Sequence, residues 1–193
     1  MIIEIIYISI YSYILGSIPF GLLLTKFFLK KDIRKIGSGN IGATNVLRTG
    51  KKSLGAATLL LDGLKGYSSV IITINFSSDY IYLSALLCFL GHIYPIWLRF
   101  KGGKGIAVYL GILFAFSLNL GFIFVISWVV ILYITKYSSL SSLISSLIIL
   151  LYSITLNNFS ISLFIFIIFI VVIYTHKENI SRIKDKTENK TNF

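Results

Sequence analysis

A polar, glycine-rich and basic segment at residues 37–52 holds the side chains best suited to bind an anion. Its glycines allow close backbone approach, and its short polar side chains add hydrogen-bonding groups. Arg48 supplies a forked guanidinium that suits phosphate oxygens. A plain connecting turn is the alternative, because the spacing matches neither a Walker loop nor a dinucleotide fingerprint. The residues expected to contact the anion are Gly37, Ser38, Gly39, Asn40, Gly42, Ala43, Thr44, Asn45 and Arg48.

A second cluster, at residues 91–105, repeats this chemistry. Lys101 and Lys104 flank two glycines, Gly102 and Gly103, just before an apolar run begins. Cations beside glycines at a helix start favour phosphate binding. A basic membrane anchor would explain the charges but not the glycines. His92 is interpreted either as a donor to substrate or as a packed, hydrogen-bonded histidine.

The third cluster follows the last apolar run and contains His176, Glu178 and Asn179. It brings a proton carrier, a carboxylate and an amide into one helical turn. His176 and Asn179 are three residues apart and share a helical face, whereas Glu178 points elsewhere. The basic residues beyond them fit a solvated tail. No serine elbow, cysteine–histidine pair or metal-ligand spacing is present in the sequence, so neither a covalent intermediate, a metal nor a cofactor is expected.

The composition indicates what must position these clusters. With 56% hydrophobic and 13% charged residues, the 193-residue chain has too little polar surface for a soluble domain. We therefore expect one all-α integral membrane domain spanning residues 1–193. The net charge of +11 is attributed to membrane lipids, phosphorylated substrates and topology rather than to nucleic acid, because the cations lie between apolar runs. Cys88 lies within such a run and is expected to be a buried thiol.

Seven apolar runs are candidate membrane spans. The positive-inside rule favours seven because this number puts all but one of the 18 basic residues on one side, whereas six would put the basic tail outside. It predicts an external N-terminus and cytoplasmic clusters. The first run carries Glu4 without a preceding cation and is interpreted as retained. The spans are 2–25, 54–76, 81–98, 106–120, 121–135, 140–156 and 161–174, with cytoplasmic loops 26–53, 99–105 and 136–139 and a tail at 175–193.

Two polar features lie inside the spans. Lys65 follows Asp62 by three residues on the same helical face. An intramembrane charge pair indicates either direct substrate contact or mutual neutralisation that ties helices together. Pro19 is expected to kink the cytoplasmic end of the first span.

Taken together, these clusters resemble the bacterial acyl-phosphate-dependent glycerol-3-phosphate acyltransferases, the PlsY family. The matching segments occur in the family's order, at 16–21 with 32–48, 61–66, 91–105 and 176–180. The resemblance implies transfer of a fatty acyl group from acyl phosphate to sn-glycerol 3-phosphate, giving 1-acylglycerol 3-phosphate (lysophosphatidic acid) and phosphate. This is the first acylation of phospholipid synthesis, at the cytoplasmic (inner) membrane of a bacterium.

Acyl phosphate carries a good leaving group, so positioning and charge stabilisation can drive direct transfer. We interpret the Ser38–Arg48 segment as the holder of one phosphate, with Lys104 neutralising charge. His176 and Asn179 would orient glycerol 3-phosphate, and the proton acceptor is either His176 or a substrate phosphate. The same resemblance implies that Lys51 and Lys52 do not bind substrate and serve as topology signals.

Two other functions fit parts of the pattern. A transporter for a phosphorylated solute would explain the spans and an anion site, but the chain has no internal repeat and its outer connections lack basic residues. A structural or lipid-binding protein would use the basic loops only to attract anionic lipids, and the glycines argue against it. The sequence leaves the oligomeric state open, a monomer included.

Overall fold

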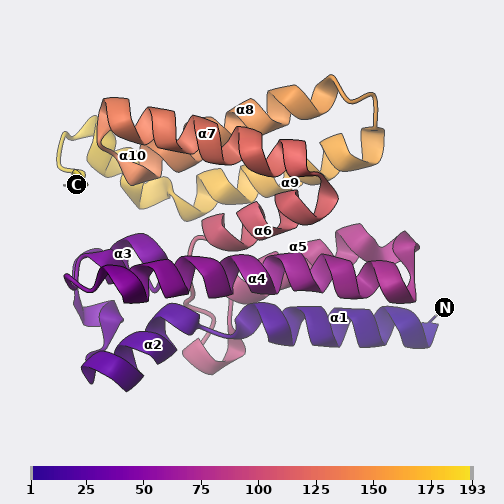
Figure 1. Ribbon diagram of the computed structural model, residues 1–193, viewed down its shortest axis with the longest axis horizontal. Coiled ribbons are helices and arrows are strands. Elements are labelled where there is room, and N and C mark those ends of the chain that lie inside the picture. The colour runs from indigo at the N-terminus through magenta and orange to yellow at the C-terminus, as the bar shows by residue number, and fades with distance from the viewer. Residues whose placement is uncertain (1, 192–193) are drawn as a thin grey trace. The chain divides into compact units, whose positions relative to one another are not determined.

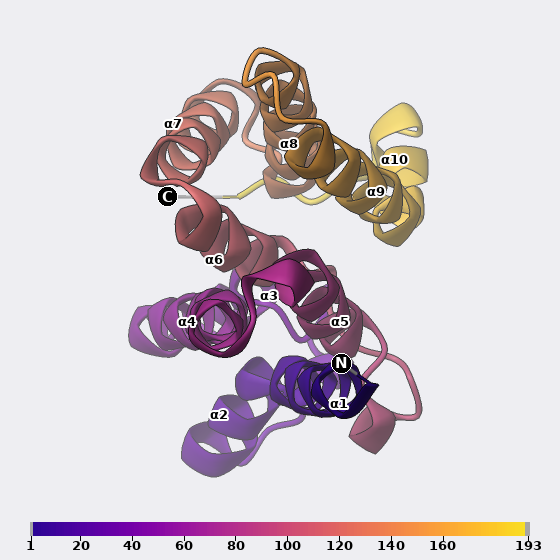
Figure 2. The same cartoon turned by 90° about the vertical axis from the view of Figure 1, so that its right-hand side faces the viewer.

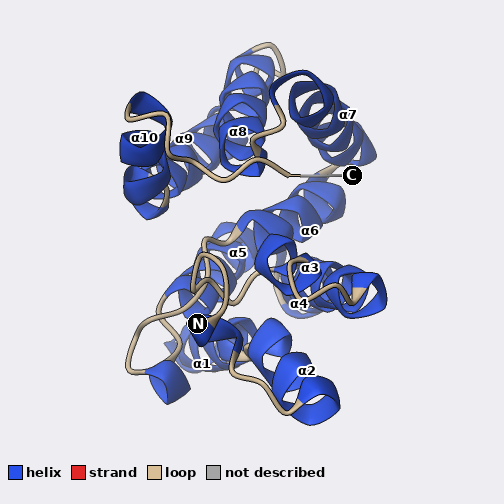
Figure 3. Cartoon of the chain, turned by 90° about the vertical axis from the view of Figure 1, so that its left-hand side faces the viewer, coloured by secondary structure: helices blue, strands red, loops and turns tan. Residues whose placement is uncertain are grey.

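The computed structural model describes residues 2–191, and every regular element within that range is a helix (Figure 3). The chain divides into two compact units, Met1–Phe116 and Ser117–Phe193, which are described separately below.

The first unit is arranged around one long helix, α4 (Lys52–Phe76), which packs against α1, α2, α3, α5 and α6 (Figures 1 and 2). The helix α3 lies over the N-terminal end of α4, and α1 also packs extensively on α5. The other bounds are α1 Ile2–Ser17, α2 Phe20–Leu29, η1 Ile33–Lys35, α3 Ala43–Leu47, η2 Ser78–Tyr80, α5 Ile81–Ile93, η3 Ile96–Leu98 and α6 Ile106–Phe116.

The first apolar run is broken at Pro19, as the sequence predicts. Proline lacks the N–H that a helix requires, so α1 ends at Ser17 and α2 begins at Phe20. The break frees carbonyl groups that find other donors. Trp97 donates its indole N–H to the Ser17 carbonyl at 2.9 Å, and Lys65 donates to the Ile18 carbonyl at 2.8 Å.

The second unit contains α7 (Leu118–Thr135), α8 (Ser138–Ile154), α9 (Phe159–Thr175) and α10 (Lys177–Lys184). The helix α8 packs on α7 and on α9. Its buried residues are mostly serines, whose small side chains allow close helix packing. Several of them donate to carbonyls one turn earlier, and Ser142 also accepts the Trp128 indole N–H at 3.0 Å. The buried serines are Ser139, Ser141, Ser142, Ser145, Ser146 and Ser153.

The helices have the length and composition expected of an integral membrane protein. By length and composition, four helical segments within the described residues can cross a membrane, and the pair α9–α10, bent by 58°, adds a fifth if it forms one span. The shorter helices α6 and α8 are also apolar. Large apolar side chains such as Ile3, at 83% exposure, and Phe159, at 81%, lie on outer faces, where lipid can cover them. The four segments are Ile2–Leu29, Lys52–Phe76, Ser78–Leu98 and Leu118–Thr135.

One predicted boundary is wrong. The expected break at residues 120–121 lies instead at Ser117, because extended backbone there ends α6 and the Ser117 hydroxyl accepts the Asn119 N–H at 3.2 Å. The span predicted at 81–98 matches the apolar segment Ser78–Leu98, within which α5 ends at Ile93, just before Pro95, since the residue preceding a proline avoids helical geometry.

Candidate active site

Asn45 is the centre of the glycine-rich loop at residues 36–48. Its side-chain amide donates to the carbonyls of Ile33, Ile36 and Asn40 at 3.2, 2.9 and 2.8 Å. Its oxygen accepts the Ser38 backbone N–H at 3.0 Å. The Asn45 amide is thus saturated by the protein, and the side chain is only 2% exposed. The sequence grouped Asn45 with the anion ligands. In the structure its buried amide bonds the loop backbone and so fixes the shape of the loop.

This frame brings Gly37, Ser38 and Arg48 together. Gly37 adopts a left-handed backbone, and a Cβ there would collide with the Asn45 amide oxygen and lie 3.0 Å from Arg48 Cδ. Only glycine accommodates both constraints. Ser38 and Arg48 remain exposed while the residue that holds them is buried. The loop therefore exposes the Ser38 hydroxyl and, beside Gly37, the Arg48 guanidinium to an approaching anion.

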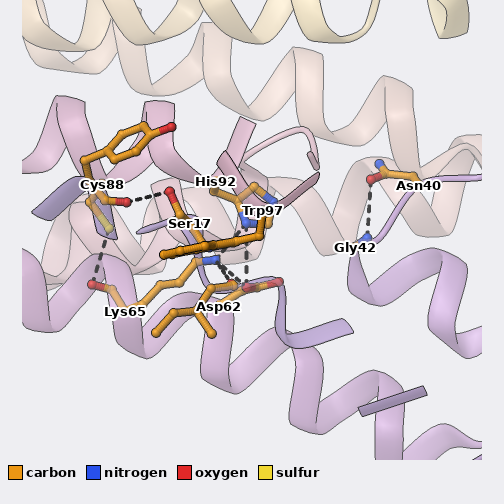
Figure 4. Close-up of polar contacts among 10 residues, drawn as sticks. Ser17, Asn40, Gly42, Asp62, Lys65, Cys88, His92 and Trp97 are labelled. Carbon is orange, nitrogen blue, oxygen red and sulfur yellow. Dashed lines mark hydrogen bonds and ion pairs between the residues drawn. The ribbon is translucent and has the colours of Figure 1, made fainter. Parts of the chain in front are cut away.

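Two turns and a small apolar core support the remainder of the loop. Asn40 accepts the Gly42 N–H at 3.3 Å, which forms the turn that leads into Ala43 and Thr44 at the start of α3 (Figure 4). Gly39 takes a left-handed backbone in the preceding turn. A small apolar core lies beneath, formed by Leu22, Ile33, Ile41 and Val46.

An exposed ion pair marks the loop entry. Arg34 approaches Asp32 to 2.6 Å, and Asp32 also caps the 3-10 helix η1 by accepting the Arg34 backbone N–H at 3.0 Å. The side-chain hydrogen bonds from Arg34 hold the pKa of Asp32 well below its usual range.

The second cluster is a turn seated on the end of α5. The carbonyls of Ile93 and His92 accept the N–H groups of Gly102 and Gly103 at 2.9 and 3.0 Å. A Cβ on Gly102 would strike the His92 carbonyl, and one on Gly103 would strike the His92 imidazole. The glycines therefore allow the turn to lie directly on His92. Lys101 is exposed and Lys104 is half-buried.

Three buried charged or polar side chains meet behind this turn, and we call Asp62, Lys65 and His92 the span cluster (Figure 4). Lys65 Nζ lies 2.8 Å from Asp62 Oδ1 and 2.9 Å from His92 Nδ1. The side chains of Asp62 and Lys65 are each 1% exposed. Of the two sequence interpretations of this pair, the contacts match the tying of helices. Cys88 lies nearby as the expected buried free thiol.

In the second unit His176 lies at the bend between α9 and α10 and is 2% exposed. Its Nδ1 lies 2.8 Å from the Val172 carbonyl oxygen. A carbonyl can only accept, so Nδ1 carries the proton and the lone pair of the neutral ring is on Nε2. That tautomer presents Nε2 as the basic atom.

Asn179 is held by a carboxylate from the tail, Glu188. The Asn179 amide donates to Glu188 Oε1 at 2.6 Å, Ser139 donates to the same oxygen at 2.7 Å, and Arg182 Nε donates to Oε2 at 2.7 Å. We call Ser139, Asn179, Arg182 and Glu188 the tail cluster. Burial raises the pKa of Glu188, but the three hydrogen-bond donors outweigh burial and the pKa is lowered overall.

Glu178 lies at the exposed edge of this cluster. Its side chain is 78% exposed and its carboxylate lies 3.8 Å from Arg182 Nη1. Sequence reasoning missed Glu188, since a carboxylate in a basic tail carries no pattern of its own.

The structure thus brings the predicted residues together in three groups. Gly37, Ser38, Gly39, Asn40, Asn45 and Arg48 share one loop, and His92 underlies Gly102 and Gly103, with Lys104 next along the chain. These two groups belong to the first unit. His176 and Asn179 are neighbours in the second unit.

Comparison with known proteins covers almost the full chain. The family model described as glycerol-3-phosphate acyltransferase matches residues 6–186. The glycerol-3-phosphate acyltransferase of Pelagibacter ubique is 56% identical over 188 residues, covering 97% of this chain and 98% of its own. That of Mesorhizobium japonicum is 47% identical over 181 residues, covering 94% and 93%.

Two crystal structures are similar throughout. Both are of PlsY, described as an integral membrane glycerol 3-phosphate acyltransferase, and both are 33% identical to this chain. The glycerol 3-phosphate form has a TM-score of 0.93 and covers 97% of this chain and 96% of its own. The lysophosphatidic acid form has a TM-score of 0.90 and covers 97% and 95%.

Proposed function

The chain belongs to the glycerol-3-phosphate acyltransferase family, and from this premise we propose that it transfers a fatty acyl group from acyl phosphate to sn-glycerol 3-phosphate. The acyltransferase activity itself follows from family membership. Glycerol 3-phosphate and lysophosphatidic acid, the two ligand forms of the related PlsY structures, are the acceptor and product of that reaction. The product would enter phospholipid synthesis.

The observation that carries the proposal is the loop built around Asn45. It exposes Ser38 and Arg48 next to a left-handed glycine, in a chain that is otherwise mostly apolar. Such a loop offers a hydroxyl and a guanidinium to a phosphate. Lys104 adds a positive charge from the turn seated on His92.

The chemical step needs little beyond positioning. The 1-hydroxyl oxygen of glycerol 3-phosphate attacks the acyl carbon, the bond from that carbon to the phosphate oxygen breaks, and inorganic phosphate leaves. Ser38, Arg48 and Lys104 balance the charge on the phosphates. The hydroxyl proton passes to His176 Nε2, the basic atom of its tautomer, or to a substrate phosphate, while Asn179 orients the acceptor.

We extend the proposal to the setting of the site. The N-terminus lies outside, seven spans cross the cytoplasmic (inner) membrane of a bacterium, and the active site faces the cytoplasm. The distribution of basic residues supports this topology, with α6 and α8 counted as short spans. Both units serve the same reaction as a single membrane domain, and the protein acts as a monomer surrounded by membrane lipids.

One assay tests the donor. Purified protein in liposomes is given glycerol 3-phosphate with acyl phosphate, acyl-CoA or acyl carrier protein, and lysophosphatidic acid is measured. We expect product from acyl phosphate alone. Product from acyl-CoA or acyl carrier protein alone would overturn the donor assignment, and solute uptake without product would indicate a transporter instead.

The residue assignments are tested in the same assay. Ser38→Ala and His176→Ala should each reduce transfer by about 100-fold or more, as removal of a charge-stabilising or proton-transferring group does. Near-normal transfer by both variants would show that the assignment is wrong. A trapped acyl-enzyme would exclude direct transfer.

A further inference from the structure

Lys65 joins three separate pieces of the first unit through one ammonium group (Figure 4). Its Nζ lies 2.8 Å from Asp62 Oδ1 on α4, 2.9 Å from His92 Nδ1 on α5 and 2.8 Å from the Ile18 carbonyl at the break between α1 and α2. The Ile18 carbonyl and His92 Nδ1 accept hydrogen bonds from the ammonium, and Asp62 Oδ1 is its ion-pair partner. Lys65 is only 2% exposed, so its charged group is engaged inside the protein.

The contact with Lys65 fixes the tautomer of His92. An ammonium only donates, so His92 Nδ1 must accept and the ring proton must be on Nε2. Asp62 Oδ1 is 3.6 Å from the same Nδ1, too far to accept a hydrogen bond from it. The Nε2 side of the ring faces Gly103, where a Cβ would strike it.

His92 in turn supports the turn that carries Lys104. Its carbonyl accepts the Gly103 N–H at 3.0 Å, and the next carbonyl, of Ile93, accepts the Gly102 N–H at 2.9 Å. A rotated imidazole would push into Gly103. The backbone preceding Lys104 therefore depends on how Lys65 holds the ring.

The hydrogen bond to the Ile18 carbonyl links Lys65 to the glycine-rich loop. Ile18 immediately precedes Pro19 and α2, and α2 touches the loop closely enough that a Cβ on Gly21 would strike the Ile41 carbonyl. One buried cation thus stabilises the elements behind both anion-binding segments of the first unit.

From these contacts we propose that Lys65, paired with Asp62, is a positioning residue that orients His92 and thereby sets the Gly102–Lys104 turn for phosphate binding. The proposal rests on the proposed function because Lys104 is taken to meet a substrate phosphate. Asp62 supplies the negative charge that pairs with the buried ammonium beside His92.

The main test removes the pair as a unit, in the double variant Asp62→Leu/Lys65→Met. Replacing both partners by apolar side chains of similar size leaves no unpaired buried charge, so the protein should fold. We expect kcat/KM for a phosphate substrate to fall about 10- to 100-fold, the cost of a misplaced catalytic group. The matched control is Ser84→Ala, which removes a buried hydroxyl between α4 and α5. It should lower thermal stability and leave kcat/KM unchanged.

A cycle with Lys104→Gln separates positioning from general support. If the cluster acts through Lys104, the double substitution should cost no more than about twofold in the Lys104→Gln background, since coupled residues are not additive. In an Asn179→Ala background, its full cost should remain. A full cost in the Lys104→Gln background, or wild-type kinetics of the folded double variant, would overturn the proposal while the acyl phosphate assay still stands.

Nitrogen NMR of labelled histidine in detergent gives a readout that needs neither activity nor the variant. The chain has two histidines, and the His176→Ala variant assigns their signals. We expect protonated Nε2 and unprotonated Nδ1 for His92 in the wild type. A His92 protonated at Nδ1 would overturn the role of Lys65 whatever the kinetics.

Discussion

The span cluster and the tail cluster both support residues of the candidate site. In the span cluster the supporting group is a cation within a helix, and in the tail cluster it is a carboxylate beyond the last helix. In the span cluster a lysine inside an apolar helix bundle supports His92. In the tail cluster a carboxylate beyond the last helix supports Asn179. Candidate site residues are therefore held in the first unit by a charge within the helices and in the second unit by the polar chain that follows the last helix.

The two clusters differ in how exposed their side chains are, and this exposure determines how much stability is lost when a contact is broken. Lys65 and Asp62 side chains are each 1% exposed, so water cannot replace a missing partner. Glu188 is 7% exposed and its partner Arg182 34%, so water can reach part of the tail cluster. We therefore expect broken contacts to cost more in the span cluster.

The largest effect should come from Lys65→Met alone. It leaves the Asp62 carboxylate buried without a cation, so the free energy of unfolding should fall by about 3–5 kcal/mol. Unfolding in detergent measures it. Lys52→Met, at the exposed start of the same helix, is the control and should cost under about 0.5 kcal/mol. Equal effects of the two substitutions would remove the distinction between buried and accessible charges.

This contrast also explains what the sequence could reveal. Asp62, Lys65 and Pro19 stand out because a charge or an imino acid is conspicuous in an apolar run, and the glycine-rich segments stand out for the same reason. The sequence could not identify Glu188 as part of the site. Its role depends on contacts with Ser139 and Asn179, which are 49 and 9 residues away in the chain. Tertiary packing alone brings such groups together.

Asn45 shows the same limit within a recognised motif. A sequence pattern places a polar residue in a loop but does not show that the Asn45 amide bonds the loop's own backbone. The span boundary was placed at residues 120–121 because Ile106–Thr135 is apolar almost throughout, and only the local cap geometry marks Ser117 as the point where one helix ends.

Asn45 supports its loop through hydrogen bonds without any charge. Its substitution therefore tests how much of the cost in the two clusters comes from charge. Asn45→Ala should leave the Ser38 N–H without its acceptor and remove the amide's hydrogen bonds to three loop carbonyls, so the free energy of unfolding should fall by about 1–3 kcal/mol. Transfer per folded protein should also fall because Ser38 and Arg48 lose their frame. The control is Asn75→Ala, whose exposed amide bonds only the Ile71 carbonyl and should be near neutral. A loss as large as that of Lys65→Met would mean that hydrogen-bond number, not charge, governs the cost.

Glu188→Gln tests the tail cluster with a smaller expected effect. The new amide still offers an oxygen to Asn179 or Ser139 but turns an N–H donor toward Arg182, so one contact of the cluster is lost. We expect kcat to fall about 3- to 10-fold, equivalent to about 1 kcal/mol. Asp185→Asn, an exposed carboxylate in the same tail, removes the same charge and should not change kcat. Equal kcat values for both variants and the wild type would show that Glu188 does not position Asn179.

The smallest effect is the pH dependence of the tail cluster. The pKa of Glu188 is lowered in the folded protein, because its hydrogen-bond donors outweigh its burial. A lowered folded-state pKa contributes stability that is fully present above the unfolded value, about 4.3, and is lost as pH falls through the folded value. The Asn179 side-chain amide signal should therefore stay constant from pH 7 to about pH 5 and change only below the ordinary glutamate pKa. Glu188→Gln should remove that change. A transition above the ordinary value in the wild type would mean that burial dominates and that Glu188 holds Asn179 as a neutral acid. The tail would then support the site without the charge that distinguishes it from the span cluster.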